Sequence, residues 1–222
     1  MSNGSSTAGL RVIAIDGPAG SGKSTVARRL AERLGLQYLD TGAMYRAVTF
    51  AALRRNIDPA DTAPVAALAR KVDLEVTLDG VVVDGVDATI EIRGPEVTRA
   101  VSTVAANAEV RSEMVARQRE WARRRGGGVI EGRDIGSVVF PDAALKVYLD
   151  ARPEVRAARR SKEVSDLDYE TVAADIARRD ALDQGREASP LTRSGDAVEV
   201  DTSDLDVDEI VELIAGQVES DG

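Results

Sequence analysis

Short apolar runs alternate with amphipathic stretches along most of the chain. Residues 11–16 form the first apolar run and predict a buried strand, and residues 22–34 have the spacing of an amphipathic helix. Further strands are expected at residues 37–39, 129–131, 145–150 and 197–203. Further helices are expected at residues 41–56 (capped by Thr41), 60–71, 95–125, 152–162, 169–183 and 207–218. This alternation predicts an α/β fold with a mostly parallel sheet covered by helices on both faces.

One segment departs from this alternation. Residues 74–92 alternate apolar and polar positions with a period of two, and the dipeptides Asp79-Gly80 and Asp84-Gly85 are turn signals within it. The pattern predicts a small antiparallel β meander inserted into an otherwise βα chain.

A glycine-rich loop follows the first predicted strand. Residues 17–24 read G-P-A-G-S-G-K-S, which matches G-x-x-x-x-G-K-[ST]. In such a loop the backbone N–H groups converge on phosphate oxygens, and the following helix adds the positive end of its dipole. Lys23 can bridge the β- and γ-phosphates, and the Ser24 hydroxyl can ligate Mg²⁺. The loop predicts a P-loop NTPase fold and an ATP site formed by Gly17, Pro18, Ala19, Gly20, Ser21, Gly22, Lys23, Ser24 and Thr25.

The composition narrows the chemistry that could accompany this loop. The 222 residues include no histidine and no cysteine, which excludes zinc sites built on those residues, thiol nucleophiles and histidine triads. Phosphoryl transfer remains, because positioning and charge do most of that work. The net charge of −9, without a long basic run, predicts no nucleic-acid partner. We also expect a cytoplasmic monomer without a membrane partner, since no apolar stretch is long enough to span a bilayer.

Three classes of P-loop protein compete at this point. A GTPase would need the guanine-reading pattern N-K-x-D, which the chain lacks. A motor ATPase is usually larger and has an apolar strand that ends in a clear acidic pair, and none stands out here. A small phosphotransferase needs a second pocket for the acceptor and cationic groups over the transferring phosphate. Motifs elsewhere in the chain that could form such a pocket would favour this class.

Three longer motifs carry a resemblance to a known family. Residues 38–46 read YLDTGAMYR, residues 131–143 read EGRDIGSVVFPDA, and residues 178–191 read RRDALDQGREASPL. The first resembles the acceptor-binding turn of nucleoside monophosphate kinases, and all three resemble motifs of bacterial cytidylate kinases. The resemblance covers roughly residues 12–215. It implies an Mg²⁺-dependent enzyme that transfers the γ-phosphate of ATP to CMP, and to dCMP.

The same resemblance implies roles for individual residues. Ser102, Arg111 and Asp134 would contact cytosine, where a carboxylate accepts from the N4 amino group but repels the carbonyl of uracil. Arg46 and Arg133 would hold the acceptor phosphate, Arg179 and Asp183 would face its ribose, and Thr41 and Tyr45 would support the pocket. The implied catalytic residues are Lys23, Arg133 and Arg186.

Simpler interpretations stay open. Arg46 and Arg111 lie on predicted helices and could be solvated surface charges, Asp134 could cap a turn before Gly136, and Tyr45 could be a packing residue. The activity could also be that of a kinase for another small acceptor, such as UMP or a coenzyme precursor. A nucleotide-binding regulator without acceptor chemistry is the alternative from a different class.

The expected organisation is a flexible tail over residues 1–9 followed by a single kinase domain over residues 10–222. Its core would comprise residues 10–72 and 101–222, with an acceptor-binding insert at about 73–100 and a helical lid at about 152–185. Residues 162–169 depart from the family, because many relatives have a longer, glycine-containing lid tip. The departure puts the amplitude of lid motion and the contacts to the ATP base in question.

Overall fold

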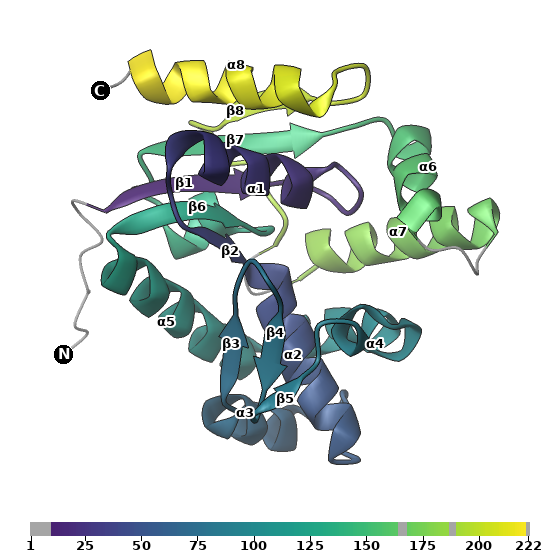
Figure 1. Ribbon diagram of the computed structural model, residues 1–222. Helices are drawn as coiled ribbons and strands as arrows, with labels where there is room; N and C mark the ends of the chain where they lie inside the picture. Colours follow the sequence, from purple (N-terminus) through teal and green to yellow (C-terminus); the bar gives the residue numbers. More distant parts are fainter. Residues whose placement is uncertain (1–9, 164–167, 187–189, 221–222) are drawn as a thin grey trace.

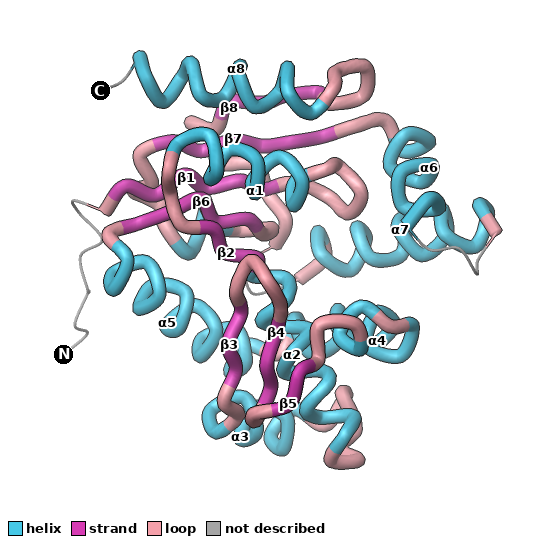
Figure 2. Tube along the Cα trace, in the orientation of Figure 1, coloured by secondary structure: helices cyan, strands magenta, loops and turns pink. Residues whose placement is uncertain are grey.

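The computed structural model describes residues 10–163, 168–186 and 190–220. A five-stranded sheet lies at its centre, and the neighbouring strands all run parallel in the order β2-β6-β1-β7-β8. The strands are β1 (Arg11–Asp16), β2 (Tyr38–Asp40), β6 (Gly127–Glu131), β7 (Leu145–Asp150) and β8 (Val198–Asp201). Helices lie on both sides of this sheet (Figures 1 and 2), which confirms the predicted fold class.

The alternation of side chains along β1 divides the core into two halves. Val12 and Ala14 are buried against α2 (Thr41–Arg54) and α5 (Ala108–Arg125). Ile13 and Ile15 point to the other face and are buried with residues of α1 (Lys23–Leu34) and α8 (Val207–Ser220). Each fully buried aliphatic side chain of this kind contributes about 1.5–3 kcal/mol to the free energy of unfolding. The two halves pack on opposite faces of the sheet, and the glycine-rich loop begins at its carboxyl edge.

A separate three-stranded antiparallel sheet confirms the predicted meander. It consists of β3 (Leu74–Val76), β4 (Val81–Val83) and β5 (Val86–Asp87). Asp84 and Gly85 both have positive φ, 50° and 75°, as a tight hairpin turn requires. The buried side chains of Val81 and Val83 join the core that surrounds α2. The insert therefore packs on one side of the central sheet, together with α3 (Thr62–Lys71) and a 3₁₀ turn (Glu91–Arg93).

The helical pattern predicted over residues 95–125 is confirmed, but it is interrupted at one residue. The structure has two helices there, α4 (Pro95–Ala106) and α5, and Asn107 separates them. The side chain of Asn107 accepts hydrogen bonds from the N–H groups of Glu109 and Val110, at 3.0 and 3.3 Å. An asparagine cap satisfies the first donors of a new helix, so the chain can turn at this residue.

The cap predicted for α2 is wrong. Asp40 is the N-cap residue, and its carboxylate accepts a hydrogen bond of 2.9 Å from the N–H group of Ala43. Thr41 is buried instead, and its hydroxyl donates a hydrogen bond of 2.7 Å to the main-chain oxygen of Glu131. Thr41 thus ties the start of α2 to the end of β6.

The glycine triplet at residues 126–128 does more than end a helix. Gly126 ends α5 in the left-handed conformation, but β6 already starts at Gly127, two residues earlier than predicted. Gly127 has φ of 121°, and a Cβ atom there would lie 2.2 Å from the main-chain oxygen of Arg11. Only glycine allows β6 to pair with β1 at this closeness.

Two helices, α6 (Pro153–Glu163) and α7 (Tyr169–Gln184), lie beyond the carboxyl end of β7 (Figure 1). Ala157 of α6 and Val172 and Ile176 of α7 form a small apolar cluster with Ala19 of the glycine-rich loop. This cluster brings both helices against the loop. The predicted tail over residues 1–9, residues 164–167 of the predicted lid tip, and residues 187–189 of the third motif lie outside the described residues.

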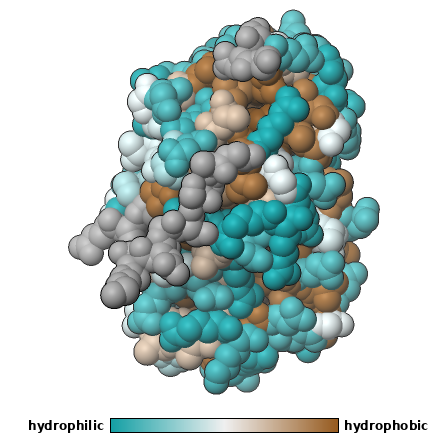
Figure 3. Space-filling view, turned by 90° about the vertical axis from the view of Figure 1, so that its left-hand side faces the viewer, coloured by the Kyte–Doolittle hydropathy of each residue, from teal (hydrophilic) through white to brown (hydrophobic). Residues whose placement is uncertain are grey.

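None of the helices in the described part of the chain is both long and apolar enough to cross a membrane. On the side of the molecule that lies to the left in Figure 1, hydrophilic residues alternate with apolar ones (Figure 3).

Candidate active site

The glycine-rich loop connects β1 with α1 at the carboxyl edge of the sheet, as its motif predicts. Gly22 precedes α1 with φ of 88°, and no side chain of the described residues caps the first N–H groups of this helix. Uncapped N–H groups at the start of a helix bind anions, because the helix dipole adds to them. Ser24 and Thr25 lie exposed on the first turn. The loop is therefore built to receive phosphate oxygens.

Lys23 is held inside this loop. Its side chain is 5% exposed, and its Nζ atom donates hydrogen bonds to the main-chain oxygen of Pro18 at 2.6 Å and to Ser21 Oγ at 3.3 Å. Burial lowers the pKa of Lys23 well below its usual value, and the positive charge of Arg133 lowers it further. An anion beside Lys23 would reverse this effect, since it favours the charged ammonium.

Glu131 is a site residue that the sequence analysis missed. It ends β6, next to β1, and its carboxylate accepts hydrogen bonds from the Ser24 hydroxyl at 2.9 Å and from the Tyr38 hydroxyl. Burial raises the pKa of Glu131 to about 7, with the charge of Asp40 adding to the rise. In the sequence, Glu131 could have been found only from its position at the end of an apolar strand. It is a single acidic residue, whereas the strand of a motor ATPase ends in an acidic pair.

The residues predicted to read the acceptor base lie together. Arg111 of α5 and Asp134 form an ion pair, and their side chains are 4% and 6% exposed. A second nitrogen of Arg111, Nη1, donates to the main-chain oxygen of Ala105 at 3.3 Å. The guanidinium carbon lies 5.4 Å from the centre of the Tyr45 ring. Arg111 is therefore not a solvated surface charge, and Tyr45 packs against it. Asp134 makes no side-chain cap to its own turn.

Ser102 belongs to the same region by its position. It is 6% exposed and precedes Ala105 by three residues on α4, so the two residues share a face of that helix. Arg111 binds the main-chain oxygen of Ala105 on this same face of α4.

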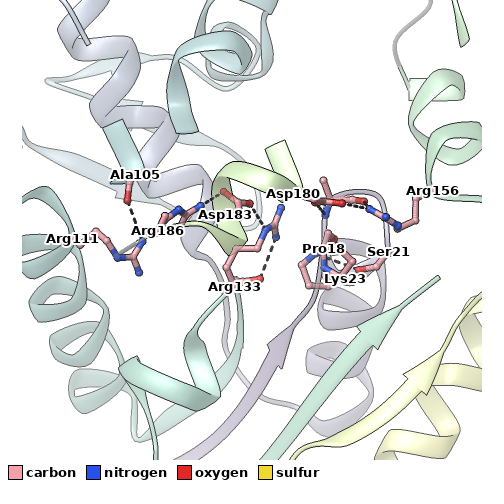
Figure 4. Close-up of polar contacts among 12 residues, drawn as sticks. Pro18, Ser21, Lys23, Ala105, Arg111, Arg133, Arg156, Asp180, Asp183 and Arg186 are labelled. Carbon is pink, nitrogen blue, oxygen red and sulfur yellow. Dashed lines mark hydrogen bonds and ion pairs between the residues drawn. The ribbon is translucent and has the colours of Figure 1, made fainter. Parts of the chain in front are cut away.

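Asp183 of α7 connects two of the predicted arginines. One carboxylate oxygen accepts a hydrogen bond of 2.9 Å from Arg133 Nε, and the other pairs with Arg186. Figure 4 shows this set as a row of polar side chains that runs from Arg111 past Arg186, Asp183 and Arg133 to the glycine-rich loop with Lys23. The residues predicted for the acceptor and for catalysis thus meet along one line.

Arginine side chains crowd this line and repel one another. Burial, together with the charges of Arg179 and Arg160, lowers the pKa of Arg46 to about 9. Burial likewise lowers the pKa of Arg179 and that of Arg186 to about 10, and Arg133 contributes to both shifts. A cluster of like charges that are partly removed from water is stabilised by a bound anion.

Arg46 has a role that its motif did not predict. Its Nη1 atom donates hydrogen bonds of 2.9 Å to the main-chain oxygen of Ile92 and to the hydroxyl of Thr98. These contacts join α2 to the segment that follows the β meander. Arg46 therefore links the arginine cluster to the predicted acceptor-binding insert.

A further contact joins α7 to the glycine-rich loop. Asp180 is 7% exposed, and its carboxylate accepts a hydrogen bond of 3.0 Å from the N–H group of Ala19. Its other oxygen pairs with Arg156 of α6, which also donates to the main-chain oxygen of Ala19 at 3.0 Å. The role of Asp180 and Arg156 was not predictable from the sequence, because nothing local to α6 or α7 indicates what these helices face.

The family model described as cytidylate kinase matches residues 13–220. A cytidylate kinase from Corynebacterium glutamicum is 48% identical over 221 residues, which is 96% of each chain. One from Bacillus subtilis is 47% identical over 215 residues, covering 93% of this chain and 96% of that protein.

The chain belongs to the cytidylate kinase family. This membership confirms the resemblance stated from the three motifs and places the chain among ATP-dependent nucleoside monophosphate kinases. Among solved structures, a gluconokinase from Sinorhizobium meliloti superimposes with a TM-score of 0.51 at 16% identity, over 96% of this chain and 93% of that one. At that identity the likeness concerns the fold alone. The nature of the acceptor is therefore argued from the cytidylate kinase motifs and not from the similarity to this solved structure.

Proposed function

We propose that this protein transfers the γ-phosphate of ATP to CMP, and to dCMP, and forms the nucleoside diphosphate and ADP. The observation that carries the proposal is the arginine cluster that runs from the buried Arg111–Asp134 pair to Lys23. One end offers hydrogen-bonding groups suited to cytosine, the middle offers cations for the acceptor phosphate, and the other end is a triphosphate loop.

The base end favours cytosine over uracil. The Asp134 carboxylate accepts hydrogen bonds only, so it matches the N4 amino group of cytosine and repels the O4 carbonyl of uracil. Arg111 donates to N3 and O2 of cytosine, and Ser102 contributes a hydroxyl. A site built on such hydrogen bonds can discriminate between related ligands by up to ~10⁴–10⁵. The Tyr45 ring packs against the guanidinium group of Arg111. The Thr41 hydroxyl ties the start of α2 to the main chain of Glu131.

The phosphate groups would lie between the two ends. Arg46 and Arg133 hold the acceptor phosphate, while Arg179 and Asp183 face the ribose. An oxygen of the CMP phosphate attacks the γ-phosphorus, and the bond from that phosphorus to ADP breaks. This oxygen is already ionised, so no general base is required, and Lys23, Arg133 and Arg186 stabilise the transferring group.

The residues at the loop fit Mg²⁺. This cation prefers oxygen ligands and usually takes only one or two from the protein, because phosphates and water supply the rest. The Ser24 hydroxyl and the Glu131 carboxylate offer such oxygens 2.9 Å apart. When bound, Mg²⁺ neutralises charge on the donor phosphates.

An ADP-release assay with CMP, dCMP, UMP and AMP as acceptors tests the proposal. We expect rapid turnover with CMP and dCMP and much lower kcat/KM with UMP and AMP. A preference for UMP would reassign the acceptor. ATP binding without ADP release on any of the four acceptors would support a nucleotide-binding regulator instead.

A further inference from the structure

Asp16 is a buried carboxylate to which the reaction above gives no role. It is the last residue of β1 and directly precedes Gly17 of the glycine-rich loop. Its side chain is 6% exposed. One carboxylate oxygen accepts a hydrogen bond of 2.8 Å from the N–H group of Ile135, and the other accepts one of 2.7 Å from that of Gly136. Both oxygens are thus used by the two residues that follow Asp134.

These two N–H groups open the short helical turn Ile135–Val139. The residue before such a turn is Asp134, and an aspartate there commonly caps the first N–H groups with its own carboxylate. Asp134 makes no such bond, and its side chain pairs with Arg111 instead. Its main-chain oxygen still accepts hydrogen bonds from the N–H groups of Val138 and Val139, at 2.9 and 3.1 Å, so Asp134 opens the turn through its backbone alone. Asp16 therefore supplies the cap that Asp134 does not.

The burial of the Asp16 carboxylate close to that of Asp134 is unfavourable if its purpose is only to cap the turn. The pKa of Asp16 is raised to about 6, because burial and, to a smaller extent, the charge of Asp134 outweigh the two N–H groups, which lower it. Two carboxylates in one buried region repel each other, and a cap by Asp134 itself would avoid the second charge. Because Asp16 caps the turn, the Asp134 carboxylate is free to pair with Arg111.

The same turn is held from its other side. A Cβ atom on Gly136 would lie 3.1 Å from Cγ of Lys146, so the stem of this lysine packs directly on the glycine. Lys146 is itself fixed by an ion pair of 2.7 Å with Asp196. The backbone at Gly136 is thus confined between Lys146 and Asp16, and a shift of this turn would carry Asp134 with it.

We propose that Asp16 is a positioning residue for acceptor recognition, because it caps the turn after Asp134 and so leaves the Asp134 carboxylate directed at Arg111 and the acceptor base. Since Asp16 is also bonded to Gly17, the same residue sets the place of this turn relative to the donor loop. The inference rests on the proposed function, in which Asp134 reads the base.

The test compares Asp16→Asn, Asp134→Asn and the double variant, with kcat/KM measured for CMP and for UMP. Asparagine can accept one of the two N–H groups but presents an amide N–H₂ to the other. We expect D16N to lower the CMP-to-UMP ratio of kcat/KM by roughly tenfold or more. The double variant should have the same ratio as D134N alone, because Asp16 acts through Asp134.

Asp180→Asn is the matched control. Asp180 is buried to a similar extent, and it also binds a main-chain N–H group and a loop next to the phosphates, but it makes no contact with Asp134 in the described residues. D180N should change the KM for ATP and leave the CMP-to-UMP ratio within about twofold. A general disturbance of buried carboxylates would move the ratio in both variants, and it would overturn the proposal.

Other outcomes are equally decisive. If D16N does not fold, Asp16→Glu, which keeps the charge on a longer side chain, is measured with the same expectation for the ratio. If the parent protein prefers CMP and the CMP-to-UMP ratio is unchanged in D16N, or in D16E where that variant replaces it, the role of Asp16 is refuted. The proposed function then still stands. A parent protein that does not prefer CMP refutes the proposed function, and the role of Asp16 with it.

Discussion

Arg111 and Asp134 form an ion pair in which both side chains are almost completely buried. Arg111 belongs to α5, whereas Asp134 follows β6, so the pair joins a helix to the carboxyl edge of the central sheet. Removal of one partner from a buried ion pair leaves an uncompensated charge, which typically costs about 3–5 kcal/mol. We expect a buried ion pair with this possible cost at a place where both charges contact a ligand.

Asp134→Asn should weaken the use of CMP and improve UMP relative to CMP. The amide can donate as well as accept, so it loses the exclusive match to the N4 amino group and no longer repels the uracil carbonyl. The ratio of kcat/KM for the two acceptors should fall by roughly tenfold or more. Asp208→Asn, an exposed site that pairs with Arg29 at 3.6 Å, is the control and should leave the ratio unchanged. An unaltered ratio in D134N would show that Asp134 does not read the base.

Lys23→Met should abolish most turnover without loss of the fold. Removal of one preorganised charge contact typically costs ~10²–10³ in rate. Because Lys23 is buried and its pKa is lowered, an apolar side chain of similar length should leave the free energy of unfolding equal or higher. ATP binding, measured by calorimetry, should change less than kcat. Lys71→Met, on the exposed end of α3, is the control, and near-parental turnover in K23M would refute the assignment of the loop.

Asp16 should make stability depend on pH. Its pKa is about 6 in the folded protein against 3.8 for an unperturbed side chain, so between these values the folded state holds a proton that the unfolded state has lost. Stability contributed by this group is therefore present at the acidic end and falls as pH rises through the window. The difference in unfolding free energy between the parent protein and D16N should change by about 3 kcal/mol across this window. Urea unfolding at several pH values measures this difference, and a constant difference would contradict the shift.

Both substrates together should close α6 and α7 over the site. The guanidinium groups of Arg46, Arg133, Arg179 and Arg186 repel one another, and anionic phosphates would relieve that repulsion and shift the population toward a closed form. Hydrogen exchange should slow in α6, in α7 and in the β meander on addition of CMP with a non-hydrolysable ATP analogue.

CMP alone is the control for this experiment. It should protect the β meander more than α6 and α7, since Arg46 connects the acceptor region to Ile92 and Thr98. Equal exchange rates in the apo and the doubly liganded protein would exclude closure. The departure from the family at residues 162–169 would then be the first feature to examine.

Features that depend on neighbouring residues were predictable from the sequence. The period of two in residues 74–92 gives the antiparallel meander, and the G-P-A-G-S-G-K-S run gives the donor loop between a strand and a helix. The local errors had local causes. Asn107 competes with helix continuation by capping a new helix, and Asp40 is a better cap than Thr41 because its carboxylate reaches Ala43.

The sequence by itself determined the elements, their order and the chemical groups available for phosphoryl transfer, because these follow from side-chain type and short-range periodicity. The tertiary structure alone decided which charges meet. Asp16 and Gly136 are 120 positions apart, and Ser24 and Glu131 are 107 apart. Such pairs form because parallel strands bring their carboxyl ends to one edge of the sheet, where side chains from distant segments are buried together. A buried polar group is costly without a partner, so most of them are paired, and no pattern within one segment states which partner that is.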